Sequence, residues 1–375
     1  LGCGGKCYET PMSLALYRKY RPQTFADVIG QTHVTRTVQN QLAQGTVAHA
    51  YLFTGPRGVG KTTAARLLAK AVNCLQPKKG EPCNACEACR AITEGRALDV
   101  VEMDAASHTD VENVRENVIK AVSFAPSQYA RKVYIIDEVH MLSASSFNAL
   151  LKTLEEPPAH ALFILATTEI HKVPETIISR CQRFDFRRIS VVDLVARLKQ
   201  IVADEKVVVS EDVLDSIARL SEGCARDAES LLSQVLALGD RKITMKEASL
   251  VLPVSSIETV VAIVDQLFSN NAAAAMREIS RAQDEGVDLE RLVRDITEMF
   301  RDLLFAKLGQ EVSNFDESTR MKKDIWIEKW ETARFVTTIE IWLAAQNQMK
   351  HTVMPTLPLE LACVKCISDF REQGV

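Results

Sequence analysis

A glycine-rich segment that ends in lysine and threonine carries the strongest chemical signal in the sequence. Residues 55–62 read Gly-Pro-Arg-Gly-Val-Gly-Lys-Thr and fit the pattern G-x-x-x-x-G-K-[ST]. In such a loop the glycines let backbone N–H groups curl around phosphate oxygens, and the lysine supplies a positive charge for the β and γ phosphates. An apolar run before it and a helical pattern after it disfavour a glycine-rich turn that binds nothing. We expect nucleotide contacts from Gly55, Pro56, Arg57, Gly58, Val59, Gly60, Lys61, Thr62 and Thr63, with Lys61 also catalytic and Thr62 a ligand of Mg²⁺.

Two carboxylates end an apolar run at residues 133–138, Val-Tyr-Ile-Ile-Asp-Glu. An apolar strand that ends in Asp-Glu is by itself usually only a strand that meets solvent. Beside a phosphate loop in the same domain, it indicates hydrolysis of a nucleoside triphosphate. We expect Asp137 to hold the Mg²⁺ shell and Glu138 to orient and polarise the attacking water.

Four cysteines, Cys74, Cys83, Cys86 and Cys89, form the pattern C-x8-C-x2-C-x2-C in a turn-rich stretch. In a reducing compartment this spacing favours a closed, tetrahedral and therefore structural zinc site. An iron–sulfur cluster and a redox pair are the alternatives. By contrast, Cys363 and Cys366 lie on an apolar helical run, which predicts core packing.

Short apolar runs alternate with amphipathic segments from about residue 49 to residue 186, which is typical of a parallel sheet flanked by helices. The α/β fold that this predicts would place the phosphate loop between a strand and a helix. Strands are expected at residues 50–54, 99–103, 132–136, 161–166 and 183–186, and helices at 62–72, 111–124, 145–155 and 174–178.

The strands are expected to stop after Arg188. Helices at about residues 191–204, 211–221 and 225–238 predict a small helical lid domain, and the helical spacing beyond residue 255 predicts an all-α domain with a loop at 309–320. The expected domains are residues 12–190 with a zinc-binding insertion at 74–89, residues 191–252, and residues 253–375. Residues 1–11 are expected to be an expression remnant, with a native start at Met12.

Composition narrows the class of protein. A length of 375 residues, with 47% hydrophobic and 25% charged residues, predicts two or three globular domains. The formal charge of −4 excludes a histone-like coat of DNA. The sequence contains neither an apolar stretch long enough to span a membrane nor a signal-peptide pattern at its start, so we expect a cytoplasmic protein.

Several segments together closely resemble one family, the gamma/tau subunits of bacterial DNA polymerase III, which are the ATPase subunits of the AAA+ sliding-clamp loader. Besides the phosphate loop and the four-cysteine insertion, the resemblance rests on residues 17–31, 137–142, 148–158 and 179–181. No single AAA+ motif identifies this family. The insertion, joined to the Leu-Glu-Glu-Pro-Pro and Ser-Arg-Cys segments, is much more specific.

The resemblance implies an AAA+ domain, a lid and a C-terminal collar that holds a ring of subunits together. It implies an ATP hydrolase within the DNA polymerase III holoenzyme, a DNA-directed DNA polymerase by complex membership. ATP, Mg²⁺ and Zn²⁺ are the implied cofactors. The implied partners are the delta and delta-prime subunits, further copies of this chain, the sliding clamp and primed DNA in a nucleoid-associated replisome. The polymerase core would be reached only through a C-terminal extension that the family's tau form carries, and which is absent after Val375.

Further site residues follow from the resemblance alone. Thr168 is similar to the sensor near the γ-phosphate, and Arg226 to the lid sensor of bound ATP. Arg180 is similar to the arginine finger that reaches into the neighbouring subunit's site. Residues expected near the adenine are Tyr20, Arg21 and Pro22.

The sequence departs from the family pattern at Glu169, Glu229 and Ser233, where we expect effects on local packing. An AAA+ nucleic-acid translocase, such as a branch-migration motor, is the alternative function. It would lack the zinc insertion and would carry a DNA-binding domain in place of the collar. A scaffold that binds ATP without hydrolysing it is disfavoured by the intact Lys61, Thr62, Asp137 and Glu138.

Overall fold

The computed structural model describes residues 15–107, 115–239, 242–252, 257–310 and 317–371. The chain forms two compact units, Leu1–Leu250 and Val251–Val375. Within the described residues, no helix combines the length and the apolar character that a membrane span requires.

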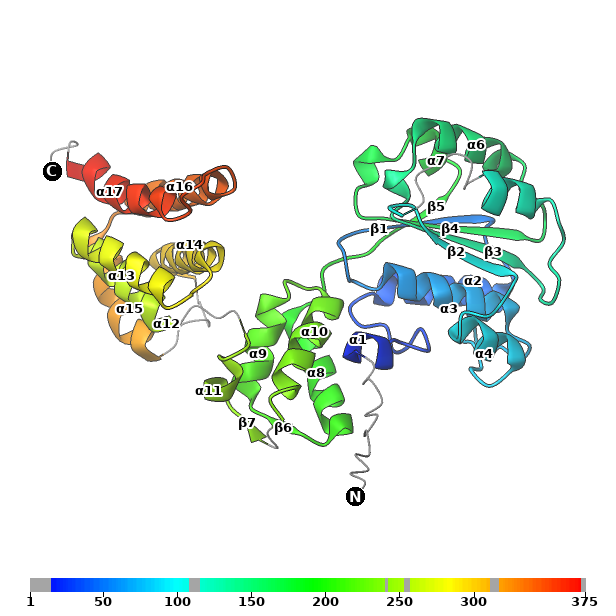
Figure 1. Ribbon diagram of the computed structural model, residues 1–375, viewed down its shortest axis with the longest axis horizontal. Coiled ribbons are helices and arrows are strands. Elements are labelled where there is room, and N and C mark those ends of the chain that lie inside the picture. Colours follow the sequence, from blue (N-terminus) through cyan, green and yellow to red (C-terminus); the bar gives the residue numbers. More distant parts are fainter. Residues whose placement is uncertain (1–14, 108–114, 240–241, 253–256, 311–316, 372–375) are drawn as a thin grey trace, which may run out of the picture. The chain divides into compact units, whose positions relative to one another are not determined.

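A five-stranded parallel sheet forms the centre of the first unit, with the strand order β2-β3-β4-β1-β5 (Figure 1). All five expected strands are present, within one residue of their expected ends. The strands are β1 (Ala50–Thr54), β2 (Val100–Asp104), β3 (Lys132–Asp137), β4 (Ala161–Thr167) and β5 (Gln182–Asp185). The central strands β1 and β4 are buried along their whole length, as their continuous apolar runs predict.

Helices cover both faces of the sheet, because alternate strand residues point to opposite sides. Tyr51 and Phe53 pack on the face that carries α2 (Thr32–Gln44) and α3 (Lys61–Asn73). Ala50 and Leu52 face α6 (Ala144–Glu155) and α7 (Glu175–Ile178), which Figure 1 shows on the other side. The helices α1 (Leu16–Lys19), α2 and α4 (Glu87–Thr93) were not expected from the sequence pattern.

The expected helix at residues 111–124 is described only in part, since residues 111–114 lie outside the described ranges. A π-helical segment occupies Arg115–Lys120, and α-helix continues for two residues beyond it. Val118 and Val122 from this segment are buried against the sheet.

The lid region of the first unit contains α8 (Val191–Glu205), α9 (Glu211–Leu220), α10 (Ala225–Leu236) and α11 (Met245–Ala248). The expectation that strands stop after Arg188 is wrong, because β6 (Val208–Val209) and β7 (Lys242–Ile243) pair in parallel here. Each is two residues long, too short to leave a periodic signal. Val209 and Ile243 in these strands are buried.

The second unit is all-helical in the part of it that is described. Its helices are α12 (Ile257–Phe268), α13 (Ala272–Asp284), α14 (Leu289–Lys307), α15 (Glu317–Lys329), α16 (Thr332–Met349) and α17 (Leu357–Arg371). Phe268 stacks on Trp326 at the centre of its core, and Cys363 and Cys366 are buried there, which confirms that they serve core packing. The expected loop at 309–320 is shorter than predicted, because its polar end already belongs to α15; residues 311–316 lie outside the described ranges.

Candidate functional site

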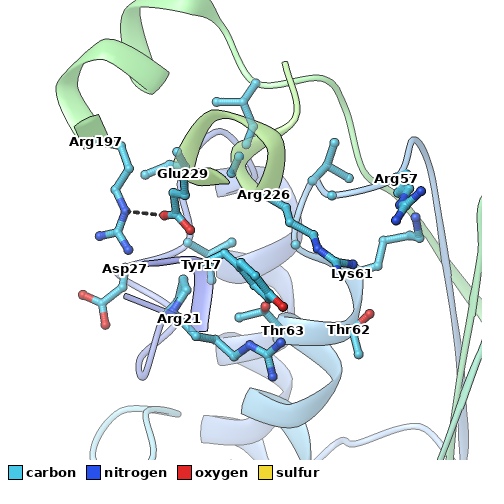
Figure 2. Close-up of a pocket in the computed structure, with 18 of the residues that line it drawn as sticks. Tyr17, Arg21, Asp27, Arg57, Lys61, Thr62, Thr63, Arg197, Arg226 and Glu229 are labelled. Atoms are coloured by element: carbon cyan, nitrogen blue, oxygen red, sulfur yellow. Dashed lines mark hydrogen bonds and ion pairs between the residues drawn. The ribbon is translucent and has the colours of Figure 1, made fainter. Parts of the chain in front are cut away.

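A cavity of about 290 Å³ lies between the phosphate loop, the segment of residues 17–29 and the lid helices α8 and α10 (Figure 2). Its lining residues are Tyr17, Arg18, Arg21, Pro22, Asp27, Val28, Ile29, Arg57, Gly58, Val59, Gly60, Lys61, Thr62, Thr63, Asp137, Glu138, Ile189, Arg197, Ala225, Arg226 and Glu229. The cavity therefore brings together residues from both ends of the first unit's sequence.

The phosphate loop joins β1 to α3, as its motif requires. Gly55 has a φ of 140°, and a Cβ there would lie 2.3 Å from the backbone oxygen of Phe186, so only glycine fits. Lys61 is 5% exposed, and its ammonium group donates to the backbone oxygens of Gly55 and Pro56, both at 2.8 Å. Burial lowers the pKa of Lys61. Gly55 and Pro56 thus anchor the lysine without lining the cavity, whereas the rest of the loop lines it.

The expected magnesium ligands lie next to each other. Thr62 Oγ1 donates to Asp137 Oδ2 at 2.6 Å, at the carboxyl end of β3. Burial raises the pKa of Asp137, which the hydrogen bond from Thr62 partly opposes. A hydroxyl oxygen and a carboxylate at this spacing fit the oxygen ligands that Mg²⁺ prefers.

Glu138 follows in the left-handed backbone conformation, with a φ of 46°. Glu138 Oε2 accepts hydrogen bonds from the Thr168 backbone N–H at 3.3 Å and from Thr168 Oγ1 at 3.0 Å. Thr168 does not line the cavity itself, but it fixes the carboxylate that does.

His140 joins this network, and the sequence analysis gave it no role. Its Nδ1 lies 3.4 Å from Glu138 Oε2 and 3.0 Å from Thr167 Oγ1, and its Nε2 lies 3.4 Å from Glu169 Oε1. Only 6% of the side chain is exposed. The sequence signal that could have identified His140 is its position directly after the two carboxylates, where the structure has a short 3-10 turn at Val139–Met141.

The lid contributes Arg226 from the first turn of α10. Its guanidinium lies over the Tyr17 ring, 4.9 Å from the ring centroid, and Figure 2 shows the two side chains together in the cavity. Hydrogen bonding from Arg18 lowers the pKa of Tyr17, and Arg226 adds to that effect. Tyr17 is a lining residue that the sequence analysis did not name.

Among the three residues expected near the adenine, Arg21 and Pro22 line the cavity and Tyr20 does not. The Tyr20 hydroxyl instead donates to Glu205 Oε1 in α8 at 2.8 Å. Tyr17, three residues earlier in the chain, lines the cavity in its place.

A buried ion pair forms the lid side of the cavity. Arg197 Nε lies 3.3 Å from Glu229 Oε1, with the side chains 12% and 8% exposed (Figure 2). Arg197 also donates to the backbone oxygen of Tyr20. Burial raises the pKa of Glu229 to about 7, although Arg197 favours its charged form. Glu229, for which we expected an effect on local packing only, therefore also lines the cavity.

Arg180 does not line this cavity. Its side chain is 32% exposed. The guanidinium forms an ion pair with Glu155 and donates to the backbone oxygen of Thr176 at 2.7 Å.

The four cysteine sulfurs of the insertion lie within 4.8 Å of one another. Tetrahedral zinc thiolate sites, with zinc–sulfur bonds of about 2.3 Å, need sulfurs this close. The backbone N–H groups of Ala85 and Cys86 lower the pKa of Cys83 to about 6, whereas burial raises the pKa values of Cys74 and Cys89. The donor set and its spacing fit a four-coordinate metal ion.

Three family models match the chain in succession. "DNA polymerase III, delta subunit" matches residues 30–190, "DNA polymerase III clamp loader subunit, ATPase lid domain" matches residues 193–241, and "DNA polymerase III subunits gamma and tau domain III" matches residues 243–372. Among solved structures, the RuvB Holliday junction branch migration motor of Thermotoga maritima is 18% identical, with a TM-score of 0.47 over 72% of this chain and 86% of that chain. A likeness at that level carries no argument about function.

Curated relatives are much more similar in sequence. DNA polymerase III subunit tau of Bacillus subtilis is 44% identical over 353 residues, which are 94% of this chain and 62% of that protein. The chain thus spans less than two thirds of that relative's length. DNA polymerase III subunit gamma of Buchnera aphidicola is 41% identical over 295 residues, which are 79% of this chain and 81% of that protein. On this evidence, the chain belongs to the family of gamma and tau subunits of DNA polymerase III.

Proposed function

We propose that this chain is the ATPase motor subunit of a DNA polymerase III clamp loader. Binding of ATP would let an assembly with delta and delta-prime subunits and further copies of this chain open a ring-shaped sliding clamp and grip primed DNA. Hydrolysis of ATP to ADP and phosphate would then release the clamp onto the DNA. The observation that carries the proposal is the Thr62–Asp137 hydrogen bond beside Lys61, with Glu138 held by Thr168 at the same cavity.

Each of these residues has a chemical role in the proposal. Lys61 would exchange its backbone partners for the β and γ phosphates. Thr62 and Asp137 would hold Mg²⁺, which would neutralise charge on the phosphate oxygens. Glu138 polarises the attacking water, and Thr168 keeps its carboxylate in place.

The lid reports the bound nucleotide through Arg226, which lies between the Tyr17 ring and the phosphate loop. Arg21 and Pro22 contact the adenosine end of the nucleotide. Tyr20 acts indirectly, by holding the lid beside the cavity: its hydroxyl binds Glu205 and its backbone oxygen binds Arg197.

Arg180 acts on a neighbouring subunit. Its side chain is partly exposed and does not line the cavity of its own subunit, which supports a role as an arginine finger in trans. Fingers supplied in trans are worth about 10³ to 10⁵ in rate, so the isolated chain should be a poor ATPase.

The ion held by Cys74, Cys83, Cys86 and Cys89 is zinc in this proposal, because four thiolates leave no open position for a substrate. Residues 12–190, 191–252 and 253–375 serve as ATPase domain, lid and collar. The packed aromatic core of the second unit supports an independent collar domain.

Steady-state ATPase measurements test the proposal. The chain is mixed with delta and delta-prime subunits, with and without clamp and primed DNA. We expect clamp and primed DNA together to stimulate hydrolysis, and Arg180→Ala to lower the stimulated rate about 10³-fold while ATP still binds. Arg183→Ala is the matched control, because Arg183 is an exposed arginine nearby that pairs with Asp185. Stimulation by duplex or junction DNA alone, without need of the partner subunits, would instead indicate a translocase.

A further inference from the structure

The cysteine insertion forms hydrogen bonds with the N-terminal wall of the cavity, at residues that do not line the cavity. Residues 21–29 form this wall segment, and its two ends line the cavity through Arg21 and Pro22 on one side and residues 27–29 on the other. The four residues between them, 23–26, do not line it. Three of these four, Gln23, Phe25 and Ala26, form hydrogen bonds with the insertion.

Glu81 of the insertion makes the central contact. Its Oε2 accepts the backbone N–H of Phe25 at 2.8 Å, and its Oε1 accepts the backbone N–H of Ala26 at 3.1 Å. Oε1 also accepts a hydrogen bond from Gln39 Nε2 of α2 at 2.6 Å. Phe25 is 2% exposed, so without Glu81 its N–H would lose its partner in a buried place.

Two further side chains hold Gln23. Asn84 Nδ2 donates to the Gln23 backbone oxygen at 3.0 Å. The buried Lys70, in the last turn of α3, donates to Gln23 Oε1 at 2.9 Å and interacts electrostatically with Cys74, Cys83 and Cys89. The same ammonium group therefore binds the wall segment and lies within electrostatic reach of the cysteines.

Two of these residues, Glu81 and Asn84, flank Cys83 in the sequence. Glu81 lies two residues before Cys83, and Asn84 lies directly after it. Lys78 and Glu81 exchange backbone hydrogen bonds at 3.0 and 2.9 Å across a turn in which Lys79 and Gly80 have φ values of 52° and 81°. This turn rests on α2, because a Cβ on Gly80 would lie 2.4 Å from the backbone oxygen of Gln39.

We propose that the cysteine insertion is a positioning element of the nucleotide cavity. Glu81 and Asn84, on either side of the metal ligand Cys83, hold residues 21–29 in the shape that admits the nucleotide, so occupancy of the metal site sets nucleotide affinity. This inference rests on the proposed function, in which the cavity binds ATP. If the wall is ordered for only a fraction of the time, the apparent affinity falls to that fraction of its full value.

Binding of two ligands to the full chain tests the positioning role. ATP needs both the phosphate loop and the wall, whereas inorganic tripolyphosphate presents only the phosphate chain. We expect Glu81→Ala to keep its metal, to bind ATP about tenfold more weakly and to bind tripolyphosphate as the wild type does. Glu94→Ala is the matched control, because Glu94 is an exposed glutamate just after α4 whose ion-pair partner is Arg96. It should bind both ligands normally.

Glu81→Gln keeps the test valid if Glu81→Ala does not fold. The amide retains the side chain's shape but turns one acceptor oxygen into an N–H₂ group that faces backbone donors, so we expect ATP to bind about threefold more weakly. Unchanged ATP affinity in both variants, or equal losses for ATP and tripolyphosphate, would overturn the inference and leave the proposed function standing. If the wild type binds neither ligand, the proposed function fails as well.

Metal removal tests the link between the two sites. The wild type is stripped with a chelator, the chelator is removed, and ATP is then added with Mg²⁺. We expect the stripped wild type to show the same loss of ATP affinity as Glu81→Ala, and stripping of Glu81→Ala to add little, because both changes release the same segment. Zinc should restore the wild type. Losses that add independently, or no loss on stripping, would contradict a control of affinity by the metal site.

Discussion

The sulfur of Cys224 occupies the space beside Gly58, 2.0 Å from the point where a Cβ on Gly58 would lie. Cys224 directly precedes α10, and Gly58 is in the phosphate loop. The backbone N–H of Arg226 also donates to the Gly58 oxygen, at 3.5 Å. The lid therefore packs directly against Gly58 of the phosphate loop. Any side chain at position 58 would push the lid away from the loop.

Gly58→Ala is the direct test of that contact. The added methyl group must displace the lid, so we expect ATP to bind about tenfold more weakly, measured by titration with a fluorescent ATP analogue. Gly45→Ala is the matched control: Gly45 has the same φ of 71° but nothing within 4 Å of its added Cβ. In Gly58→Ala combined with Cys224→Ala, most of the affinity should return. Equal losses in the single and the double variant would show that backbone strain, not the sulfur, is the cause.

Glu229 should make stability depend on pH. Its pKa in the folded chain is about 7, above the ordinary 4.5, so the folded state holds the proton more tightly than the unfolded state. The protonated Glu229 carboxyl therefore contributes about 3 kcal/mol to the free energy of unfolding. This contribution is complete below pH 4.5 and is lost as the pH rises through 7. Glu229→Gln removes it, so the variant's Tm should rise relative to wild type by several degrees between pH 4.5 and pH 8. A Tm difference that stays constant over this range would contradict the prediction.

Thr168→Val should separate hydrolysis from binding. The substitution removes the Oγ1 hydrogen bond to Glu138 but keeps the side chain's size. We expect the stimulated ATPase rate to fall about 10- to 100-fold, since a base that is badly oriented loses part of its catalytic effect. ATP affinity should remain within about twofold, because Thr168 does not line the cavity. A loss of affinity as large as the loss of rate would show that Thr168 acts on binding instead.

The cysteine cluster predicts one zinc ion per chain. Elemental analysis should find it in the wild type, and Cys86→Ser should lose it, because three thiolates hold zinc much more weakly than four. Cys363→Ala is the matched control, since Cys363 belongs to a buried C-x2-C pair that only packs in the core of the second unit. Visible absorption together with bound iron would identify an iron–sulfur cluster in place of zinc.

The sequence alone determined the parts of this protein whose geometry is local. The phosphate loop, the Asp-Glu pair and the cysteine spacing each specify their own shape within a few residues, and the five strands follow from continuous apolar runs. The resemblance to the family was visible in those same local segments, together with residues 17–31, 148–158 and 179–181. Strands β6 and β7 were missed because two residues are too few to form a pattern.

The tertiary structure alone decided which distant residues meet around the cavity. Glu81 binds Phe25 across 56 positions of sequence, and Arg197 pairs with Glu229 across 32. His140 meets Glu169 only because β3 and β4 are neighbours in the sheet. Periodicity and motif spacing report on neighbours along the chain, whereas these contacts depend on how helices and strands pack. For that reason the wall of the cavity, its buried ion pair and its connection to the cysteine insertion became visible only in the folded chain.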